Sequence, residues 1–218
     1  VLENMDVAIK SGRIALVGNA DHTLGGETLV IDAKDKYLTP GFLDGHVHVE
    51  SSMVTLTQFA RAVQSHGTTS VFIDPHEIAN VLGLRGVKLM LNEGKNLPLK
   101  VFVCVPSCVP VAPDFETAGA EITPQDVEDA LKWEGVVGLG EVMNYPGVLQ
   151  GDAKMHAEIQ AALRANKVVE GHADALLNND LAAYAAVGIG SCHESTGKIE
   201  GIQRLRLGLC TMIREGSA

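Results

Sequence analysis

The chain has 218 residues, a length that fits one α/β barrel domain, or part of a barrel with a small additional segment. Its formal net charge is −10 and only 4% of its residues are aromatic, so we expect neither a basic nucleic-acid surface nor a base-stacking platform. No apolar run approaches the roughly 20 residues of a membrane-spanning helix. The four cysteines lack zinc-ribbon or disulfide-framework spacing, which favours a reducing compartment, and we expect a cytoplasmic protein.

Residues 1–38 are predicted to form a small all-β segment. Residues 7–10 and 13–18 are apolar-rich runs on either side of a Ser11-Gly12 turn, which predicts a hairpin. Residues 28–32 and 37–38 are expected to add two further strands. No helical pattern occurs here, so we place a domain boundary between residues 38 and 39.

From Gly41 onward, strand patterns alternate with helix patterns. This alternation predicts a parallel sheet and favours a (β/α)₈ barrel in which about seven of the eight strands are present. An open, doubly wound sheet is the alternative, but no Gly-x-Gly-x-x-Gly motif follows an early strand. Strands are predicted at residues 42–49, 69–73, 100–105, 135–143, 168–172, 188–193 and 209–214. Helices are predicted after Thr55, over 78–92, after Thr123 and Asp152, and over 180–187 and 199–207.

The first strand of this barrel carries the clearest chemical signal. Apolar residues alternate with His46, His48 and Glu50, a period of two that places the three side chains on one face. Both imidazoles could then reach one metal ion. Two solvated histidines on a surface strand are the plain alternative, because a His-x-His pair alone is common.

Similar residues close three later strands of the predicted barrel. Glu141 ends the fourth strand, His172 the fifth and His193 the sixth. Each could be an ordinary solvated or hydrogen-bonded group when taken singly. Together with His46 and His48 they could hold two metal ions, with the carboxylate as a bridge.

Several sequence blocks resemble the amidohydrolase superfamily and, within it, the adenine deaminase family of bacteria and archaea. These blocks cover residues 40–53, 74–83, 106–110, 140–144 and 212–218. The resemblance implies hydrolysis of adenine to hypoxanthine and ammonia by metal-activated hydroxide, as part of purine salvage. It implies a binuclear site of Mn²⁺ or Fe²⁺, with Zn²⁺ as an alternative, and a preceding β-sandwich segment over residues 1–38. It also implies that His46, His48, Glu141, His172 and His193 are the ligands.

Other residues are candidates for proton transfer and for binding the base. Glu77, Asp74 and Glu50 could supply the acid or orient the ligands, although Asp74-Pro75 is also a common turn signal. We predict that His76, Ser107 and Cys108 bind the substrate. No base is placed near Cys108 by the sequence, so we do not expect it to act as a nucleophile.

The chain departs from the family pattern in places. Cys192 stands before the sixth-strand histidine where an Asp is expected, and residues 170–174 read Glu-Gly-His-Ala-Asp instead of Asp-Gly-His-Ala-Pro. The chain resembles an N-terminal fragment, so a strand-eight Asp is expected about 30 to 60 residues beyond Ala218, and a homo-oligomer is expected of the full-length protein. Two alternatives stay open: a cyclic-amide hydrolase, disfavoured because Glu141 stands where a Lys is usual, and a non-catalytic metal-binding module.

Overall fold

The computed structural model describes residues 1–113 and 115–213, and the chain divides into two compact units, Val1–Pro40 and Gly41–Ala218. The first unit contains the predicted hairpin, in which β1 (Asp6–Lys10) pairs with the antiparallel β2 (Arg13–Gly18). Ser11 and Gly12 both have positive φ angles, as a tight hairpin turn requires. A short 3₁₀ helix, Asp21–Thr23, follows.

The two further strands predicted in the first unit are wrong. Residues 28–32 and 37–38 have no strand assignment, and Leu29 and Tyr37 are largely exposed. A strand pattern becomes a strand only when a neighbouring strand supplies hydrogen-bond partners. Within residues 1–40 only β1 and β2 pair with one another.

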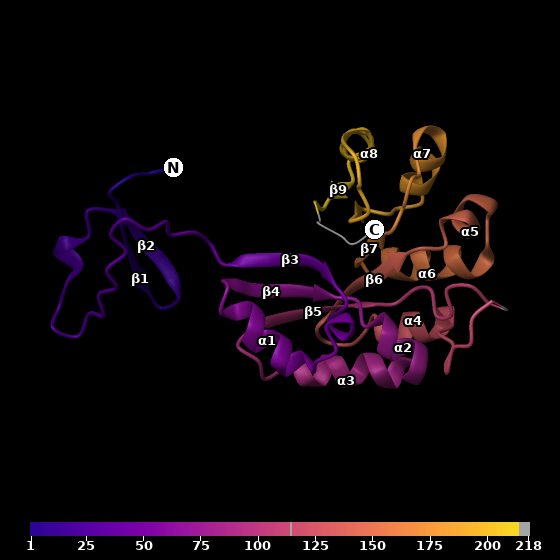
Figure 1. Cartoon of the computed structure of the whole chain (residues 1–218), viewed down its shortest axis with the longest axis horizontal. Helices are drawn as coiled ribbons and strands as arrows, with labels where there is room; N and C mark the ends of the chain where they lie inside the picture. The colour runs from indigo at the N-terminus through magenta and orange to yellow at the C-terminus, as the bar shows by residue number, and fades with distance from the viewer. Residues whose placement is uncertain (114, 214–218) are drawn as a thin grey trace. The chain divides into compact units, whose positions relative to one another are not determined.

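The second unit is built on a parallel sheet of seven described strands that pair in chain order (Figure 1). This confirms the predicted partial (β/α)₈ barrel. The middle of the sheet is buried on both faces, as the consecutive buried residues Val103, Cys104 and Val105 show, whereas Phe42 and Leu43 in the first strand of this sheet are 59% exposed. The strands are β3 (Phe42–Val47), β4 (Thr68–Ile73), β5 (Lys100–Val105), β6 (Val136–Val142), β7 (Val168–Gly171), β8 (Ser191–Cys192) and β9 (Cys210–Thr211).

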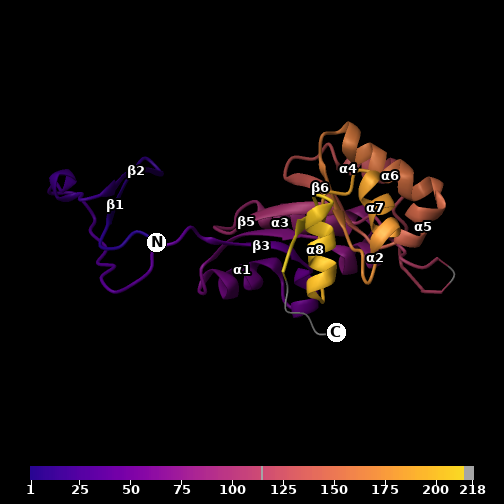
Figure 2. The same cartoon turned by 90° about the horizontal axis from the view of Figure 1, so that it is seen from above.

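Helices follow the strands and pack on the outside of the sheet. Figure 1 shows α1 and α3 on the same side of β3, β4 and β5, and Figure 2 shows α4 beside α6, an arrangement that their contacts confirm. The helices are α1 (Leu56–Gln64), α2 (His76–Leu82), α3 (Leu84–Gly94), α4 (Pro124–Ala130), α5 (Tyr145–Gln150), α6 (Ala153–Arg164), α7 (Asn178–Ala186) and α8 (Lys198–Arg206).

The predicted helix starts are confirmed by side-chain caps. The side chains of Thr55 and Asp152 accept hydrogen bonds from backbone N–H groups of the first turns of α1 and α6. Thr123 and Asp126 form a reciprocal capping box at α4, with Pro124 at the first helical position. Among the described residues, no helix is both long and apolar enough to cross a membrane.

Several elements differ from the prediction. The strand expected over residues 42–49 ends at Val47, and residues 49–52 form a 3₁₀ turn, so Glu50 does not share a strand face with His46. The helix expected over 78–92 is divided at Gly83, whose φ of +59° interrupts helical geometry. Helix α5 was not expected. The last two strands are shorter than predicted, and residue 214 lies outside the described residues.

Candidate metal centre

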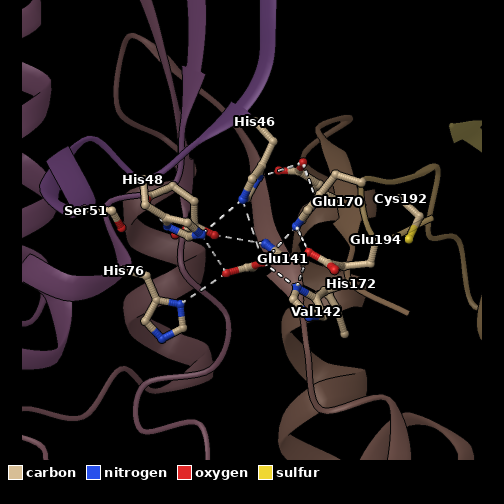
Figure 3. A network of polar contacts seen from close by, with 12 residues as sticks. His46, His48, Ser51, His76, Glu141, Val142, Glu170, His172, Cys192 and Glu194 are labelled. Atoms are coloured by element: carbon tan, nitrogen blue, oxygen red, sulfur yellow. Dashed lines mark hydrogen bonds and ion pairs between the residues drawn. The ribbon is translucent and has the colours of Figure 1, made fainter. Parts of the chain in front are cut away.

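Polar side chains gather at the carboxyl ends of the parallel strands (Figure 3). Parallel strands end at the same edge of a sheet, so residues far apart in the chain meet there. β3 supplies His46, and His48 follows its last residue. β6 supplies Glu141, whereas His172 and His193 directly follow β7 and β8. The structure therefore brings together all five residues that were predicted as metal ligands.

Glu141 lies at the centre of this cluster, and its side chain is 4% exposed. Its Oε1 atom is 3.0 Å from His48 Nε2. Its Oε2 atom is 2.6 Å from His172 Nδ1 and 3.1 Å from His193 Nε2. The two carboxylate oxygens thus face different imidazoles, as they do when a carboxylate bridges two ions.

His46 and His48 form the first set of imidazoles. Their Nε2 atoms are 3.1 Å apart. Two nitrogens that bind one ion at about 2.1 Å lie about 3.0 to 3.4 Å from each other, so the spacing fits a shared ion. The His46 ring also stacks on the His193 ring, with centroids 3.6 Å apart, which places the first set against the second set of His172 and His193.

The charges of the cluster favour bound cations. Burial opposes ionisation of Glu141, but the surrounding imidazoles hold the pKa of its carboxyl far below the usual range. Burial also opposes protonation of the imidazoles, yet Glu141 and neighbouring carboxylates raise the pKa of His48 to about 10 and that of His193 to about 9. Positive charge is therefore stabilised here, whether protons or divalent ions supply it.

Some of the closest contacts are not hydrogen bonds. His193 Nε2 is 3.1 Å from Glu141, and His46 Nδ1 is 2.9 Å from Glu170 Oε1, yet neither nitrogen has a hydrogen-bond partner among the described residues. Buried polar atoms without partners are costly, and an ion would satisfy such nitrogens. The donors therefore suit a divalent metal ion. Within the described part of the chain, four sets have ligand atoms within 4.8 Å of one another: His46, His48 and Glu141; His46, Glu170 and His193; Glu141, His172 and His193; and Asp74, His76 and Glu141.

Asp74 lies fully buried beside Glu141. Its Oδ2 atom accepts a hydrogen bond of 3.0 Å from the backbone N–H of Glu141, and its carbonyl oxygen lies 2.8 Å from His48 Nδ1. Burial and the charge of Glu141 raise the pKa of Asp74 to about 8. A Cβ at Gly140 would collide with this carboxyl group, so only glycine fits there. Asp74 thus holds both Glu141 and His48.

The other two carboxylates predicted for proton transfer lie on the side of His48. Glu77 is half exposed, with Oε2 at 3.5 Å from His48 Nδ1, and its Oε1 accepts a hydrogen bond of 2.8 Å from Ser51. Glu50 accepts a hydrogen bond of 3.2 Å from the backbone N–H of Ile78. Burial raises the pKa of Glu50. Glu77 is the more accessible acid, and Glu50 anchors the start of α2.

The three residues predicted to bind substrate are all buried. His76 Nδ1 is 3.8 Å from Glu141 Oε1, and its Nε2 atom has no hydrogen-bond partner within residues 1–113 and 115–213. Ser107 donates a hydrogen bond of 2.8 Å to the carbonyl oxygen of Glu141. Cys108 belongs to the hydrophobic core, with its sulfur 3.9 Å from that of Met155. Their contact with a substrate stays a prediction.

Sequence reasoning missed two carboxylates of the cluster. Glu170 Oε1 contacts the Nδ1 atoms of His46 and His193 at 2.9 and 3.4 Å. Glu194 Oε1 lies 3.4 Å from His193 Nε2. The signal for Glu170 was available, because it precedes His172 by two residues on a buried strand and so shares its face. Glu194 follows its strand, where no periodicity applies.

Tyr184, on α7, ties two of the ligand-bearing strands together. Its hydroxyl accepts a hydrogen bond of 2.9 Å from the backbone N–H of His172 and donates one of 2.6 Å to the carbonyl oxygen of Val142. Val142 is the neighbour of Glu141. The side chain of Tyr184 is fully buried, so these bonds are shielded from water.

Comparison with known proteins adds to this geometry. Residues 37–216 match the model described as the amidohydrolase family. A protein named adenine deaminase from Moorella thermoacetica is 60% identical over 214 residues, which are 98% of this chain and 36% of that protein. Proteins of the same name from Clostridium botulinum and Rubrobacter xylanophilus are 52% and 54% identical, each over 100% of this chain and 37% of the relative. The chain thus spans little more than a third of the length of these curated relatives.

Proposed function

The chain belongs to the amidohydrolase family, and on that premise we propose that it carries active-site residues of an enzyme that hydrolyses adenine to hypoxanthine and ammonia. The observation that carries this proposal is 60% identity, over 98% of the chain, to a protein named adenine deaminase. The cluster around Glu141 supports it with donors that suit divalent ions. We place the reaction in purine salvage in the cytoplasm, in a homo-oligomer of the full-length protein.

We assign the two sets of imidazoles to two ions. His46 and His48 would hold one ion, His172 and His193 the other, and Glu141 both. Mn²⁺ or Fe²⁺ is proposed, with Zn²⁺ as the alternative, because imidazole and carboxylate donors accept all three. When bound, such ions lower the pKa of coordinated water from about 15.7 to about 7 and so supply a nucleophile at neutral pH.

The carboxylates around His48 would manage the protons. Attack at C6 of adenine places negative charge on the ring, so N1 must gain a proton and the departing nitrogen must leave as ammonia. We assign the proton transfer to Glu77, because its half-exposed carboxylate reaches His48 from the accessible side. Glu50 holds α2, which carries Glu77, in position through the N–H of Ile78.

Asp74 would support the reaction from behind Glu141. It fixes the backbone of Glu141 and the ring of His48. We propose that His76 contacts the base, since its buried Nε2 atom has a hydrogen bond to offer. We propose that Ser107 and Cys108 line the pocket on the far side of the adenine ring.

The experiment is a substrate comparison on the purified protein loaded with Mn²⁺. Hypoxanthine and ammonia should form in equal amounts from adenine, and adenosine should react far more slowly because a pocket closed around the free base excludes ribose. Glu141→Ala should abolish turnover, while Glu134→Ala, a change of an exposed Glu, should not. Hydrolysis of dihydroorotate or hydantoin with adenine left intact would replace this proposal by the cyclic-amide alternative.

A further inference from the structure

Arg204 is the largest fully buried side chain among the described residues, and no step of the proposed reaction uses it. It lies on α8, outside the metal centre. Taking a guanidinium group out of water costs several kcal/mol, and an apolar side chain would fill the same space at lower cost. The burial of Arg204 therefore has to be explained by the groups that its guanidinium binds.

The guanidinium group joins two loops that follow neighbouring strands. One terminal nitrogen, Nη2, donates to the carbonyl oxygen of Ala173, and the other, Nη1, donates to Ser195 Oγ at 2.8 Å. Ala173 directly follows His172, and Ser195 comes two residues after His193. Both histidines contact Glu141 Oε2. Arg204 therefore joins the two chain segments that carry the second set of imidazoles.

The charge of Arg204 is paired within the same network. Its Nη1 atom lies 3.4 Å from Glu200 Oε2, one helical turn earlier on α8. That carboxylate also accepts a hydrogen bond of 2.8 Å from the backbone N–H of Thr196. The loop after β8 is thus attached to α8 at Ser195 and at Thr196. The strand β8 itself has only two residues and fixes little of this loop through backbone pairing.

From this geometry we infer that Arg204 is a positioning residue that sets the spacing of His172 and His193 and so determines the affinity of the second set for its ion. The inference rests on the assignment of these histidines as ligands in the proposed function. A planar guanidinium holds two acceptors in fixed directions, which a single flexible ammonium group cannot do. Loss of this geometry should weaken the second ion and spare the first, which His46 and His48 hold without Arg204.

Titration of the metal-free protein with Mn²⁺, followed by the electron paramagnetic resonance of free Mn²⁺, tests this without any substrate. The wild type should bind two equivalents. Arg204→Lys and Arg204→Met should bind one equivalent normally and the other about 10- to 100-fold more weakly, the usual effect of losing a group that supports a ligand. Arg206→Met, an exposed change on the same helix, should leave both affinities unchanged.

Chemical rescue separates positioning from general damage to the fold. Millimolar guanidinium should restore the second equivalent in Arg204→Ala and should not affect Arg204→Met, where the space is filled. Wild-type affinities in both the Lys and the Met variants would overturn the inference, as would equal weakening of both equivalents, because Arg204 would then not act on the second set in particular. Adenine turnover is measured separately: its absence in a wild type with two bound Mn²⁺ would reject the proposed function and leave Arg204 in place.

Discussion

The two sets of imidazoles around Glu141 are held in different ways. His46 lies within β3, and β3 and its neighbour β4 are both strands of six residues. His172 and His193 follow strands of four and two residues. A long strand fixes its side chains through many backbone hydrogen bonds, whereas a short strand fixes few.

Side chains from outer helices support the second set instead. Tyr184 on α7 binds the backbone of His172, and Arg204 on α8 binds the residues that follow His172 and His193. The first set has supports of its own: the backbone carbonyl oxygen of Asp74 lies 2.8 Å from His48 Nδ1, and Asp44 Oδ1 accepts a hydrogen bond of 3.2 Å from the backbone N–H of His46. The comparison indicates that His172 and His193 depend more on side chains of the outer helices than His46 and His48 do. Substitutions should therefore affect the two sets separately, except at Glu141 and Glu170, whose carboxylates contact both sets.

The largest effect is expected from Glu141→Ala, which removes the carboxylate between His48 of the first set and His172 and His193 of the second. At least one metal equivalent should be lost, and because bound ions contribute several kcal/mol to transition-state stabilisation, activity should fall roughly 10³-fold or more. Elemental analysis and the rate of hypoxanthine formation measure the two effects. Full metal occupancy in this variant would show that Glu141 is not a ligand. The two sets of imidazoles would then not be joined through it.

A second prediction concerns Glu158. Its substitution tests the stability of the fold and not the metal affinity of either set of imidazoles. Glu158 is fully buried on α6, no residue that the structure describes forms a hydrogen bond with its carboxyl group, and burial raises its pKa to about 8. The folded state therefore binds a proton that the unfolded state releases above its ordinary pKa of about 4.5. The contribution of Glu158 to stability should be complete below pH 4.5 and should decline up to about pH 8, by on the order of 3 to 5 kcal/mol.

Urea unfolding of the wild type and of Glu158→Gln at several pH values measures this difference. The variant should lack the decline, so its advantage over the wild type should grow between pH 5 and pH 8. The exposed change Glu134→Gln should follow the wild type at every pH. Parallel curves for Glu158→Gln and the wild type would show that Glu158 has a partner that neutralises its charge.

Tyr184→Phe should have a smaller effect, directed at the second set. It leaves the N–H of His172 and the carbonyl of Val142 without their buried partner, which costs about 1 to 3 kcal/mol of stability. Mn²⁺ titration should show a weakened second equivalent and an unchanged first. Tyr37→Phe, an exposed change, serves as the control. Equal weakening of both equivalents would contradict the separation of the two sets.

Much of the cluster could be predicted from local sequence patterns. Period-two alternation identified His46 and His48, and strand ends identified Glu141, His172 and His193, because a parallel sheet places all strand ends at one edge. The same alternation failed at Glu50, since the chain turns into a 3₁₀ helix at Val49 and leaves Met53 with a positive φ. Periodicity gives no warning of where a strand stops.

The supports of the cluster could not be predicted in the same way. Arg204 and Tyr184 act through contacts with residues 31 and 12 positions away in the sequence, and nothing in their own helices indicates those partners. An Arg near the end of a helix is usually solvated at the surface, so its burial had no sequence signal. The strand predicted at residues 28–32 was wrong for a related reason. A strand needs a partner strand, and the local sequence does not show whether one is present.

The smallest expected effect comes from the start of α8. The side chains of Thr55, Thr123, Asn144 and Asp152 cap α1, α4, α5 and α6, whereas α7 and α8 begin without a side-chain cap. Gly197 is the residue before α8, its φ of −142° suits any residue, and nothing lies within 4 Å of a Cβ built there. Ser at this position can accept a hydrogen bond from the first turn of α8, so Gly197→Ser should stabilise the protein by a few tenths of a kcal/mol.

Gly197→Ala, which offers no acceptor, is the control in urea unfolding. Because α8 carries Arg204, the Ser variant should also hold the second Mn²⁺ slightly tighter, and a gain confined to the first equivalent would contradict the link between α8 and the second set.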